Sequence, residues 1–245
     1  MIRGLLRGRP AFLASVVSAT EAVDALNAGA DIIDCKNPAL GALGALSPSA
    51  IREIVAVAGG RVPVSATAGD LPADAEAMCA AAIATAATGV DFVKIGFFGD
   101  GDARAAIRAL GRTDLAGTRL VAVLMADRTP DLTLIPALQA AGFAGVMLDT
   151  ANKAAAALTD VLAPDQLLAF LAAARASNMT AGLAGSLRRP HIATLVDLAP
   201  DILGFRGALC RSGRVSALDG ALVRAVRDGI DAARAARSCK MRSVA

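Results

Sequence analysis

The chain has 245 residues, of which 25 are Lys or Arg and 22 are Asp or Glu, so its formal net charge is +3. That length suits one large globular domain, and the small charge excess gives no argument for nucleic acid as a partner. Aromatic residues make up only 3% of the chain, without Trp or Tyr, so it has no stacking surface for bases.

Eight short apolar segments have the character of buried strands. They are Phe12–Val17, Asp31–Lys36, Val62–Thr67, Asp91–Gly96, Arg119–Ala126, Gly145–Asp149, Thr180–Ser186 and Asp201–Arg206. Each is followed by a helical segment, and these are Thr20–Ala28, Pro48–Ala58, Pro72–Thr88, Asp102–Leu110, Leu132–Ala141, Pro164–Ala176, Pro190–Leu198 and Ser216–Arg237. Apolar strands without alternation are typical of a parallel sheet covered by helices, and eight β–α pairs predict a closed (β/α)8 TIM barrel, an α/β fold.

We expect a single barrel domain over residues 1–237 and a flexible C-terminal tail over residues 238–245. A short pattern recurs before several strands, as in Ala28–Ile33, Thr88–Val93 and Leu198–Leu203, and it is typical of a helix end that leads into a parallel strand. An open doubly wound sheet is the structural alternative. A dinucleotide-binding version of it has little support, because no G-x-G-x-x-G follows the first strand.

Lysine is scarce, and three of the four lysines lie at or near predicted strand ends. The four are Lys36, Lys94, Lys153 and Lys240, and the other 21 basic residues are arginines. In a barrel the active site lies at the carboxyl ends of the strands. An arginine cannot lose its proton at ordinary pH, whereas a lysine can, so the places where lysine persists are informative.

Aspartates accompany these lysines. Asp34 and Lys36 lie two apart on one strand and therefore project to the same face, and Asp149 ends another strand. Burial and a neighbouring cation both lower the pKa of a lysine and make its amine a nucleophile, which suits imine chemistry with a carbonyl substrate. The alternative is that Lys36, Lys94, Lys153 and the aspartates form structural ion pairs that fill the mouth of the barrel.

Glycine-rich loops end the last two predicted strands. Backbone N–H groups of such loops commonly hold a phosphate in this fold, which makes Gly185, Ser186, Arg206, Gly207 and Ala208 the candidate phosphate-binding residues. In this hypothesis Arg206 adds a charge contact. The alternative is that the glycines serve only the turns and that Ser186 caps the following helix.

The His and Cys residues favour no metal site. His191 is the only histidine and is expected to cap a helix or lie at the surface, and the four cysteines have no C-x-x-C spacing. Cys35 is expected to pack in the core on the face opposite Asp34 and Lys36, while Cys210 draws attention only by its place in the last loop. The cysteine pattern resembles no disulfide framework and favours a reduced, cytoplasmic protein.

Several of these strand-end motifs together resemble those of a known family. They are Asp31–Pro38 with Gly41, Gly44 and Ala45; Val64–Thr67 with Gly69 and Asp70; Phe92–Gly96; Met147–Ala151 with Lys153; Leu183–Ser186; and Gly204–Ala208. The sequence is thereby similar, over about residues 12–235, to the (5-formylfuran-3-yl)methyl phosphate synthases, also called 4-(hydroxymethyl)-2-furancarboxaldehyde phosphate synthases.

The resemblance implies a barrel enzyme, a lyase related in mechanism to class I aldolases. It would condense two molecules of glyceraldehyde 3-phosphate into a phosphorylated furan aldehyde, 4-HFC-P, with release of phosphate and water, on the way to methanofuran or methylofuran in one-carbon metabolism. The family's Schiff-base lysine matches Lys36 and its proton-accepting lysine matches Lys94. The accompanying catalytic residues match Asp34, Asp149 and Lys153, and no cofactor or metal is implied.

The chain also departs from the resemblance. Its fifth strand ends Met125-Ala126-Asp127, where archaeal members have a tyrosine, so a strand-5 aromatic is missing although Asp127 still fits. The Ala- and Arg-rich composition indicates a bacterial source and favours the methylofuran branch.

Two other functions remain open from the residues alone, a class I phosphotriose aldolase or isomerase and a non-catalytic phosphosugar-binding protein. The expected partners are a small triose phosphate and further copies of the chain as a homo-oligomer, with neither nucleic acid nor membrane.

Overall fold

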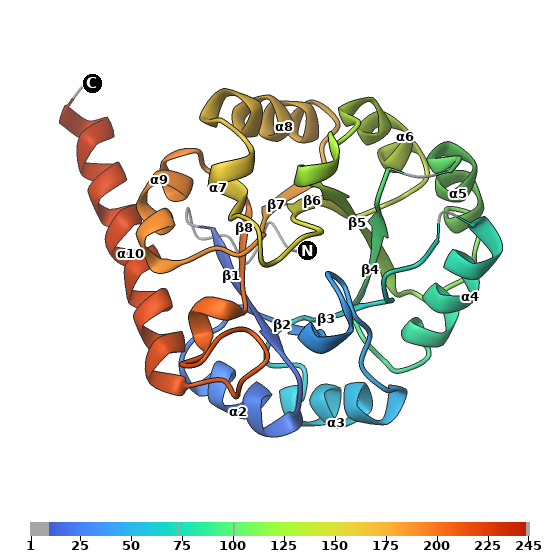
Figure 1. Cartoon of the computed structure of the whole chain (residues 1–245), viewed down its shortest axis with the longest axis horizontal. Coiled ribbons are helices and arrows are strands. Elements are labelled where there is room, and N and C mark those ends of the chain that lie inside the picture. The colour runs from blue at the N-terminus through green and yellow to red at the C-terminus, as the bar shows by residue number, and fades with distance from the viewer. Residues whose placement is uncertain (1–9, 73, 100, 244–245) are drawn as a thin grey trace.

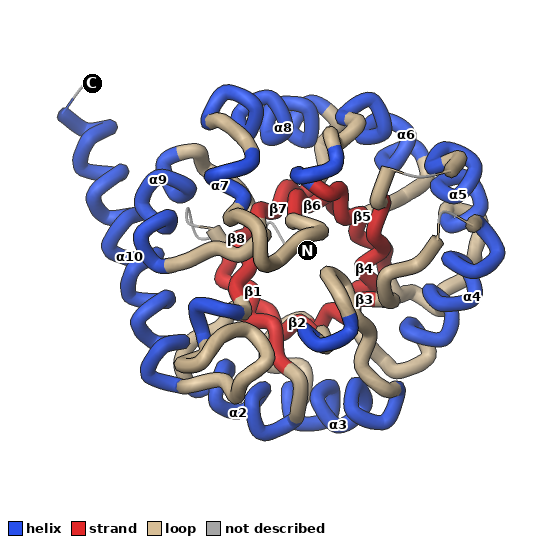
Figure 2. Tube along the Cα trace, in the orientation of Figure 1, coloured by secondary structure: helices blue, strands red, loops and turns tan. Residues whose placement is uncertain are grey.

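The computed structural model describes residues 10–72, 74–99 and 101–243, and within this part of the chain eight parallel strands close into one barrel. The ring runs in chain order, and the first strand pairs with the last, with Leu13 beside Gly204. Helices surround the strands as an outer layer (Figures 1 and 2). The TIM-barrel prediction is confirmed, and the open-sheet alternative is wrong.

The strands are β1 (Ala11–Val16), β2 (Ile32–Cys35), β3 (Val64–Thr67), β4 (Phe92–Phe97), β5 (Arg119–Met125), β6 (Gly145–Asp149), β7 (Thr180–Leu183) and β8 (Ile202–Phe205). The helices are α2 (Ala19–Asn27), α3 (Pro48–Ala58), α4 (Ala75–Ala86), α5 (Ala103–Leu110), α6 (Ile135–Ala140), α7 (Leu158–Val161), α8 (Pro164–Ala176), α9 (Ile192–Asp197) and α10 (Gly220–Ser243). Short 3-10 turns follow several strands, at Pro38–Leu40, Ala126–Arg128, Leu132–Leu134, Arg189–His191 and Gly207–Leu209. No helix among the described residues is long and apolar enough to cross a membrane.

Side chains alternate between two apolar layers. One buried cluster includes Phe12, Ile33 and Val93 and lies between strands and helices, while a smaller one includes Leu13, Phe92 and Met147 and fills the barrel interior. Successive residues of a strand face opposite sides. The inward-facing side chains nearest the carboxyl ends of the strands are therefore those of Ser15, Asp34, Lys94 and Asp149. The barrel is therefore packed with apolar side chains below and lined by polar ones above.

Glycines on two strands leave space for side chains inside the barrel. A Cβ on Gly182 of β7 would lie 2.7 Å from the side chain of Met147, and one on Gly204 of β8 would lie 3.2 Å from the Cβ of Ala184. A side chain at Gly182 would have to displace Met147. These two glycines thus serve the packing of the barrel.

Three aspartates hold the other end of the barrel and explain the pattern that recurs in the sequence. Asp31 accepts a hydrogen bond from Phe12 N, Asp91 from Val64 N, and Asp201 from Ala181 N, each at 2.8 Å. Each of these aspartates directly precedes an even-numbered strand, and its carboxylate joins that strand to the backbone of the strand before it. The recurring Asp therefore stabilises the pairing of the strands at their amino ends, away from the polar mouth of the barrel.

Most element bounds differ from the prediction by one to four residues, and three departures bear on the site or on the predicted tail. Helix α7 was not predicted. Strand β7 ends at Leu183 instead of Ser186, because Gly185 and Ser186 have φ of +112° and +48°, outside the range of a strand.

The last helix begins at Gly220 and runs to Ser243, past the predicted end at Arg237. Its outer part is held by Arg237, which donates to Val196 O, and by an exposed ion pair between Lys240 and Asp197. Figure 1 shows this part of α10 continuing beyond α9. The flexibility expected of residues 238–245 stays a prediction.

Candidate active site

Three of the four lysines meet at the carboxyl ends of the strands. Lys36 directly follows β2, Lys94 lies within β4, and Lys153 lies in the loop after β6. All three, with Asp149, line one cavity of about 700 Å³. Lys36 and Lys94 are only 6% and 4% exposed, so their charges must be compensated within the protein.

Asp34 compensates Lys94. The Lys94 ammonium lies 3.0 Å and 3.1 Å from the two carboxylate oxygens, and Asp34 is fully buried. The hydroxyls of Ser15 and Ser65 donate to the same carboxylate at 2.9 Å and 2.6 Å. These residues are register neighbours on β1, β2 and β3, so the parallel pairing of consecutive strands places both donors beside Asp34.

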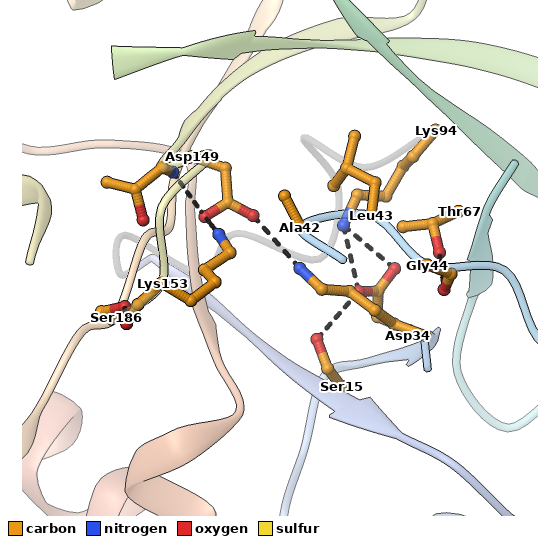
Figure 3. Close-up of polar contacts among 12 residues, drawn as sticks. Ser15, Asp34, Ala42, Leu43, Gly44, Thr67, Lys94, Asp149, Lys153 and Ser186 are labelled. Carbon is orange, nitrogen blue, oxygen red and sulfur yellow. Dashed lines mark hydrogen bonds and ion pairs between the residues drawn. The ribbon is translucent and has the colours of Figure 1, made fainter. Parts of the chain in front are cut away.

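Asp149 is shared by the other two lysines. Lys36 Nζ lies 3.2 Å from Asp149 Oδ2, Lys153 Nζ donates to Oδ1, and Thr150 N donates to Oδ1 at 2.8 Å. Figure 3 shows the Lys153–Asp149 pair on one side of the site and the Lys94–Asp34 pair on the other. Burial alone would raise the pKa of Asp149, but the ammonium groups of Lys153 and Lys36 outweigh it and hold that pKa well below its usual range.

The pKa of Lys153 falls to about 8. Burial is the largest cause, and the positive charge of Lys36 acts in the same direction, while Asp149 opposes both. Near neutral pH this amine can therefore be either protonated or neutral, which is the property required of a general acid or base.

Two further aspartates fix the loops that carry or border these lysines. Asp127, after β5, accepts hydrogen bonds from Ala151 N and Asn152 N, both at 2.7 Å, directly before Lys153. Asp70, after β3, accepts from Ala42 N at 2.8 Å and from Leu43 N at 2.6 Å. Each carboxylate therefore holds the loop of a neighbouring strand.

The loops after β7 and β8 border the same cavity. Gly185, Ser186, Gly207 and Ala208 all line it, as expected for candidate phosphate-binding residues. The Ser186 hydroxyl donates to Lys153 O at 3.0 Å, which ties the β7 loop to the lysine loop. Their binding of phosphate stays a prediction, since it depends on a ligand.

The charge contact expected from Arg206 needs correction. Its guanidinium lies in a buried ion pair with Glu21, with Nη1 2.5 Å from Oε2. Its other N–H groups donate to Ser15 O, Arg214 O and Ser216 O. With all five N–H groups occupied, the side chain has no donor left for a phosphate.

The minor candidates lie as predicted. His191 accepts a hydrogen bond from Arg188 N, which is a capping role, and Cys35 is packed in the outer apolar layer. Burial, with the nearby Asp34 charge, raises the pKa of the Cys35 thiol. Cys210 lines the cavity and its thiol donates to Arg206 O at 3.4 Å. No group of three or more His, Cys, Asp or Glu within the described part of the chain could hold a metal ion.

Several contributors to the site were not among the predicted site residues. Ser15 and Ser65 bind Asp34, and the cavity is also lined by Arg188, Arg189, Arg211 and Arg214. The inward alternation of β1 and β3 could have indicated the two serines. The position of Arg214 has no local signal, because it depends on how the long loop between β8 and α10 folds back over the barrel.

Comparison with known proteins identifies the family. The model of the 4-HFC-P synthase family matches residues 12–227. A relative from Archaeoglobus fulgidus named (5-formylfuran-3-yl)methyl phosphate synthase is 37% identical over 86% of this chain and 95% of its own, and one of the same name from Methanopyrus kandleri is 38% identical over 84% and 91%. A protein from Methylorubrum extorquens, itself only proposed to be such a synthase, is 49% identical over 88% of this chain and 89% of its own.

Solved structures agree on the fold. Phosphoribosyl anthranilate isomerase from Thermus thermophilus has a TM-score of 0.63 at 14% identity and covers 90% of this chain and 98% of its own. The 3-hexulose-6-phosphate synthase from Salmonella typhimurium has a TM-score of 0.63 at 17% identity, with 91% and 99% covered. The family match, the relatives and the lysine-lined barrel mouth lead to one conclusion: the chain belongs to the 4-HFC-P synthase family and is an enzyme.

Proposed function

We propose that the chain condenses two molecules of glyceraldehyde 3-phosphate into (5-formylfuran-3-yl)methyl phosphate through a Schiff base on Lys36. The names of the relatives support this product. The observation that carries the chemistry is one cavity lined by Lys36, Lys94, Lys153 and Asp149, beside which the buried Asp34 is paired with Lys94. Two three-carbon units give the six-carbon product, with one phosphate and two water molecules released.

Lys36 is the proposed nucleophile. Its amine attacks the carbonyl carbon of one triose phosphate, and loss of water gives an iminium that makes the adjacent C–H acidic. The Lys36 ammonium is hydrogen-bonded to Asp149 at 3.2 Å, so the carboxylate is in reach to take up and return the proton that the amine must lose.

Lys94 is the proposed proton acceptor for that C–H, after its ammonium has given one proton to the paired Asp34 carboxylate. It lies on the strand two places from β2 around the ring and is held by Asp34, which Ser15 and Ser65 fix in turn. Once the C–H proton is removed, the resulting enamine carbon attacks the aldehyde of the second triose phosphate. Lys153, paired with Asp149, would protonate the hydroxyl that leaves as water.

The decisive experiment is borohydride trapping in the presence of glyceraldehyde 3-phosphate. We expect a mass adduct that maps to Lys36, and we expect Lys36→Ala to abolish both the adduct and the product. Lys240→Ala is the matched control, because Lys240 is the only lysine outside the cavity and lies exposed on α10. Failure to trap any adduct on Lys36 under turnover conditions would overturn the covalent step.

Product analysis separates this function from a simple phosphotriose aldolase or isomerase. Only furan synthesis yields an aldehyde that absorbs strongly in the ultraviolet together with stoichiometric phosphate. The chain has neither Trp nor Tyr, so its own near-ultraviolet absorbance is very low and the product can be followed directly. We further propose that the product enters methylofuran or methanofuran formation.

A further inference from the structure

We propose that Arg214 is the side chain that binds a substrate phosphate in this cavity, in the role that the sequence assigns to Arg206. This inference rests on the proposed function, because it assumes that the substrate is a triose phosphate. It names a residue of the β8 loop that none of the strand-end motifs includes.

The first observation is the position of Arg214. It lines the cavity together with Lys36, Asp149 and Lys153. Its Cβ lies 3.8 Å from the place that a Cβ on Gly207 would occupy, so the later part of the β8 loop folds back over the start of that loop. Its Nη2 donates to Gly41 O, in the β2 loop, at 3.1 Å. The side chain thus reaches from the β8 loop to the β2 loop across the carboxyl end of β1.

The second observation is that the charge of Arg214 is not compensated by an ion pair. Of the other arginines that line the cavity, Arg206 and Arg211 are each paired with a carboxylate, and Arg188 and Arg189 are exposed to solvent. No described carboxylate lies within ion-pair distance of Arg214. Arg214 is half-buried, and its bond to Gly41 O is the one hydrogen bond its guanidinium makes among the described residues. The remaining N–H groups are available to a ligand.

The surrounding charges favour an anion. Lys36, Lys153 and Arg214 line the cavity together with one carboxylate, that of Asp149, and Lys94 is already paired with Asp34. A second carboxylate near Arg214, that of Asp70, lies outside the lining and already accepts hydrogen bonds from Ala42 N and Leu43 N. A partly desolvated site with an excess of positive charge stabilises a bound phosphate more than water does. The planar guanidinium can in addition donate two parallel hydrogen bonds to phosphate oxygens.

The third observation is that both ends of the Arg214 contact are fixed. Arg206 Nε donates to Arg214 O at 2.8 Å, and Glu21, the partner of Arg206, accepts from Leu218 N at 3.0 Å. On the other side, Asp70 holds the two residues that follow Gly41. Arg206 and Glu21 are therefore positioning residues: they hold the loop that presents Arg214 to the cavity. A cation held in place loses little freedom when it binds its ligand.

The test is a calorimetric titration with inorganic phosphate, which needs no turnover. We expect Arg214→Met to weaken phosphate binding at least about 10-fold, because a hydrogen bond to a charged group is lost, and Arg214→Lys to retain part of the affinity. Arg52→Met is the matched control, since Arg52 is exposed on α3 outside the cavity. Thermal unfolding establishes that each variant is folded, and Arg214→Gln replaces the Met variant if that one is not. Phosphate affinity equal to that of the wild type in the folded neutral variant would overturn the proposal.

A second measurement tests whether Arg214 binds the phosphate group of the substrate. Borohydride trapping at limiting concentration is compared for glyceraldehyde 3-phosphate and for glyceraldehyde, which lacks the phosphate. We expect the wild type and Arg52→Met to prefer the phosphorylated aldehyde, and Arg214→Met to lose most of that preference while still reacting with glyceraldehyde. An unchanged preference would overturn the role of Arg214 and leave the furan synthesis standing. If instead the wild type makes no furan but binds phosphate through Arg214, the proposed function fails and the binding role stands.

Discussion

At the scale of a single residue, Lys153 links the electrostatics of the cavity to a measurable pH dependence. Burial lowers its pKa to about 8, so its amine is mostly protonated at pH 7 and mostly neutral above pH 8. If Lys153 protonates a leaving hydroxyl, kcat/KM must fall as the pH rises through about 8. We expect this limb in the wild-type pH profile and its absence in Lys153→Met, whose rate should be lower by about 100-fold or more. A limb near pH 8 that persists in Lys153→Met would assign it to another group.

The surroundings of Cys35 have the opposite effect: they keep a potentially reactive thiol unreactive. It lies between Asp34 and Lys36 in sequence, but its thiol is buried in the outer apolar layer, where desolvation raises its pKa. A thiol that stays protonated is a poor nucleophile. We expect iodoacetamide at pH 8 to modify the exposed Cys239 of the folded protein and to spare Cys35, as peptide mass mapping would reveal. Modification of Cys35 at the rate of Cys239 in folded protein would contradict the buried position.

At the scale of elements, Asp127 connects two neighbouring β–α units. Its two bonds to Ala151 N and Asn152 N fix the start of the loop that carries Lys153. We expect Asp127→Ala to lower kcat about 10-fold and to shift the pH limb of Lys153, because the amine is no longer held beside Asp149. Asp127→Asn, which keeps one acceptor oxygen, should recover part of the activity. Asp131→Ala is the control, because Asp131 caps an exposed turn; an effect as large as that of Asp127→Ala would contradict a specific role.

The ion pair between Glu21 of α2 and Arg206 after β8 joins the first and last β–α units. Both side chains are buried, and Glu21 also accepts hydrogen bonds from Val17 N and Leu218 N. Removing one partner of a buried pair leaves an uncompensated charge, so we expect Glu21→Gln to lower the free energy of unfolding by about 3 kcal/mol. Urea denaturation measures this. Arg211→Gln, which breaks an exposed pair, should cost far less, and equal losses would contradict the argument.

At the scale of the whole molecule, the barrel and the place of its lysines could be predicted from the sequence. Strands in a parallel barrel are buried on both faces, so each appears as a compact apolar run, and the repeated helix-end pattern marks where each run begins. Since all strands point the same way, every strand end lies at one mouth. That geometry alone brings Lys36, Lys94 and Lys153 together, although they are far apart in the chain.

The remaining features depend on contacts that no local pattern encodes. Arg206 is paired with a residue 185 positions earlier, and that pair turns its side chain away from the cavity. Asp70 and Asp127 bind backbone N–H groups of the loop after a neighbouring strand, and only the pairing of those strands brings the loop near. Helix α7 is one short turn of four residues, too short for periodicity to reveal. The sequence therefore indicated which residues reach the mouth, but not which of them face the ligand and which hold a loop.

Because the eight strands form one closed ring, protonation of a single buried carboxylate changes the stability of the whole domain. The folded-state pKa of Asp149 lies well below its usual value, so its contribution to stability is present above about pH 4 and is lost as the pH falls towards the depressed pKa. Between those limits the unfolded chain binds a proton that the folded protein does not, and this residue alone makes stability fall by about 1.4 kcal/mol per pH unit.

Asp149→Asn tests this linkage. At pH 7 we expect the variant to be less stable than the wild type, because the ammonium groups of Lys36 and Lys153 lose their shared carboxylate. From pH 4 to pH 3 its stability should fall less steeply than that of the wild type, because the group that takes up the proton is gone. Urea denaturation at stepped pH gives both quantities, and Asp165→Asn, at an exposed carboxylate on α8, should keep the wild-type slope. Equal slopes in wild type and Asp149→Asn would mean that the two lysines do not depress the pKa of Asp149, and the ion-paired state of the cavity would have to be abandoned.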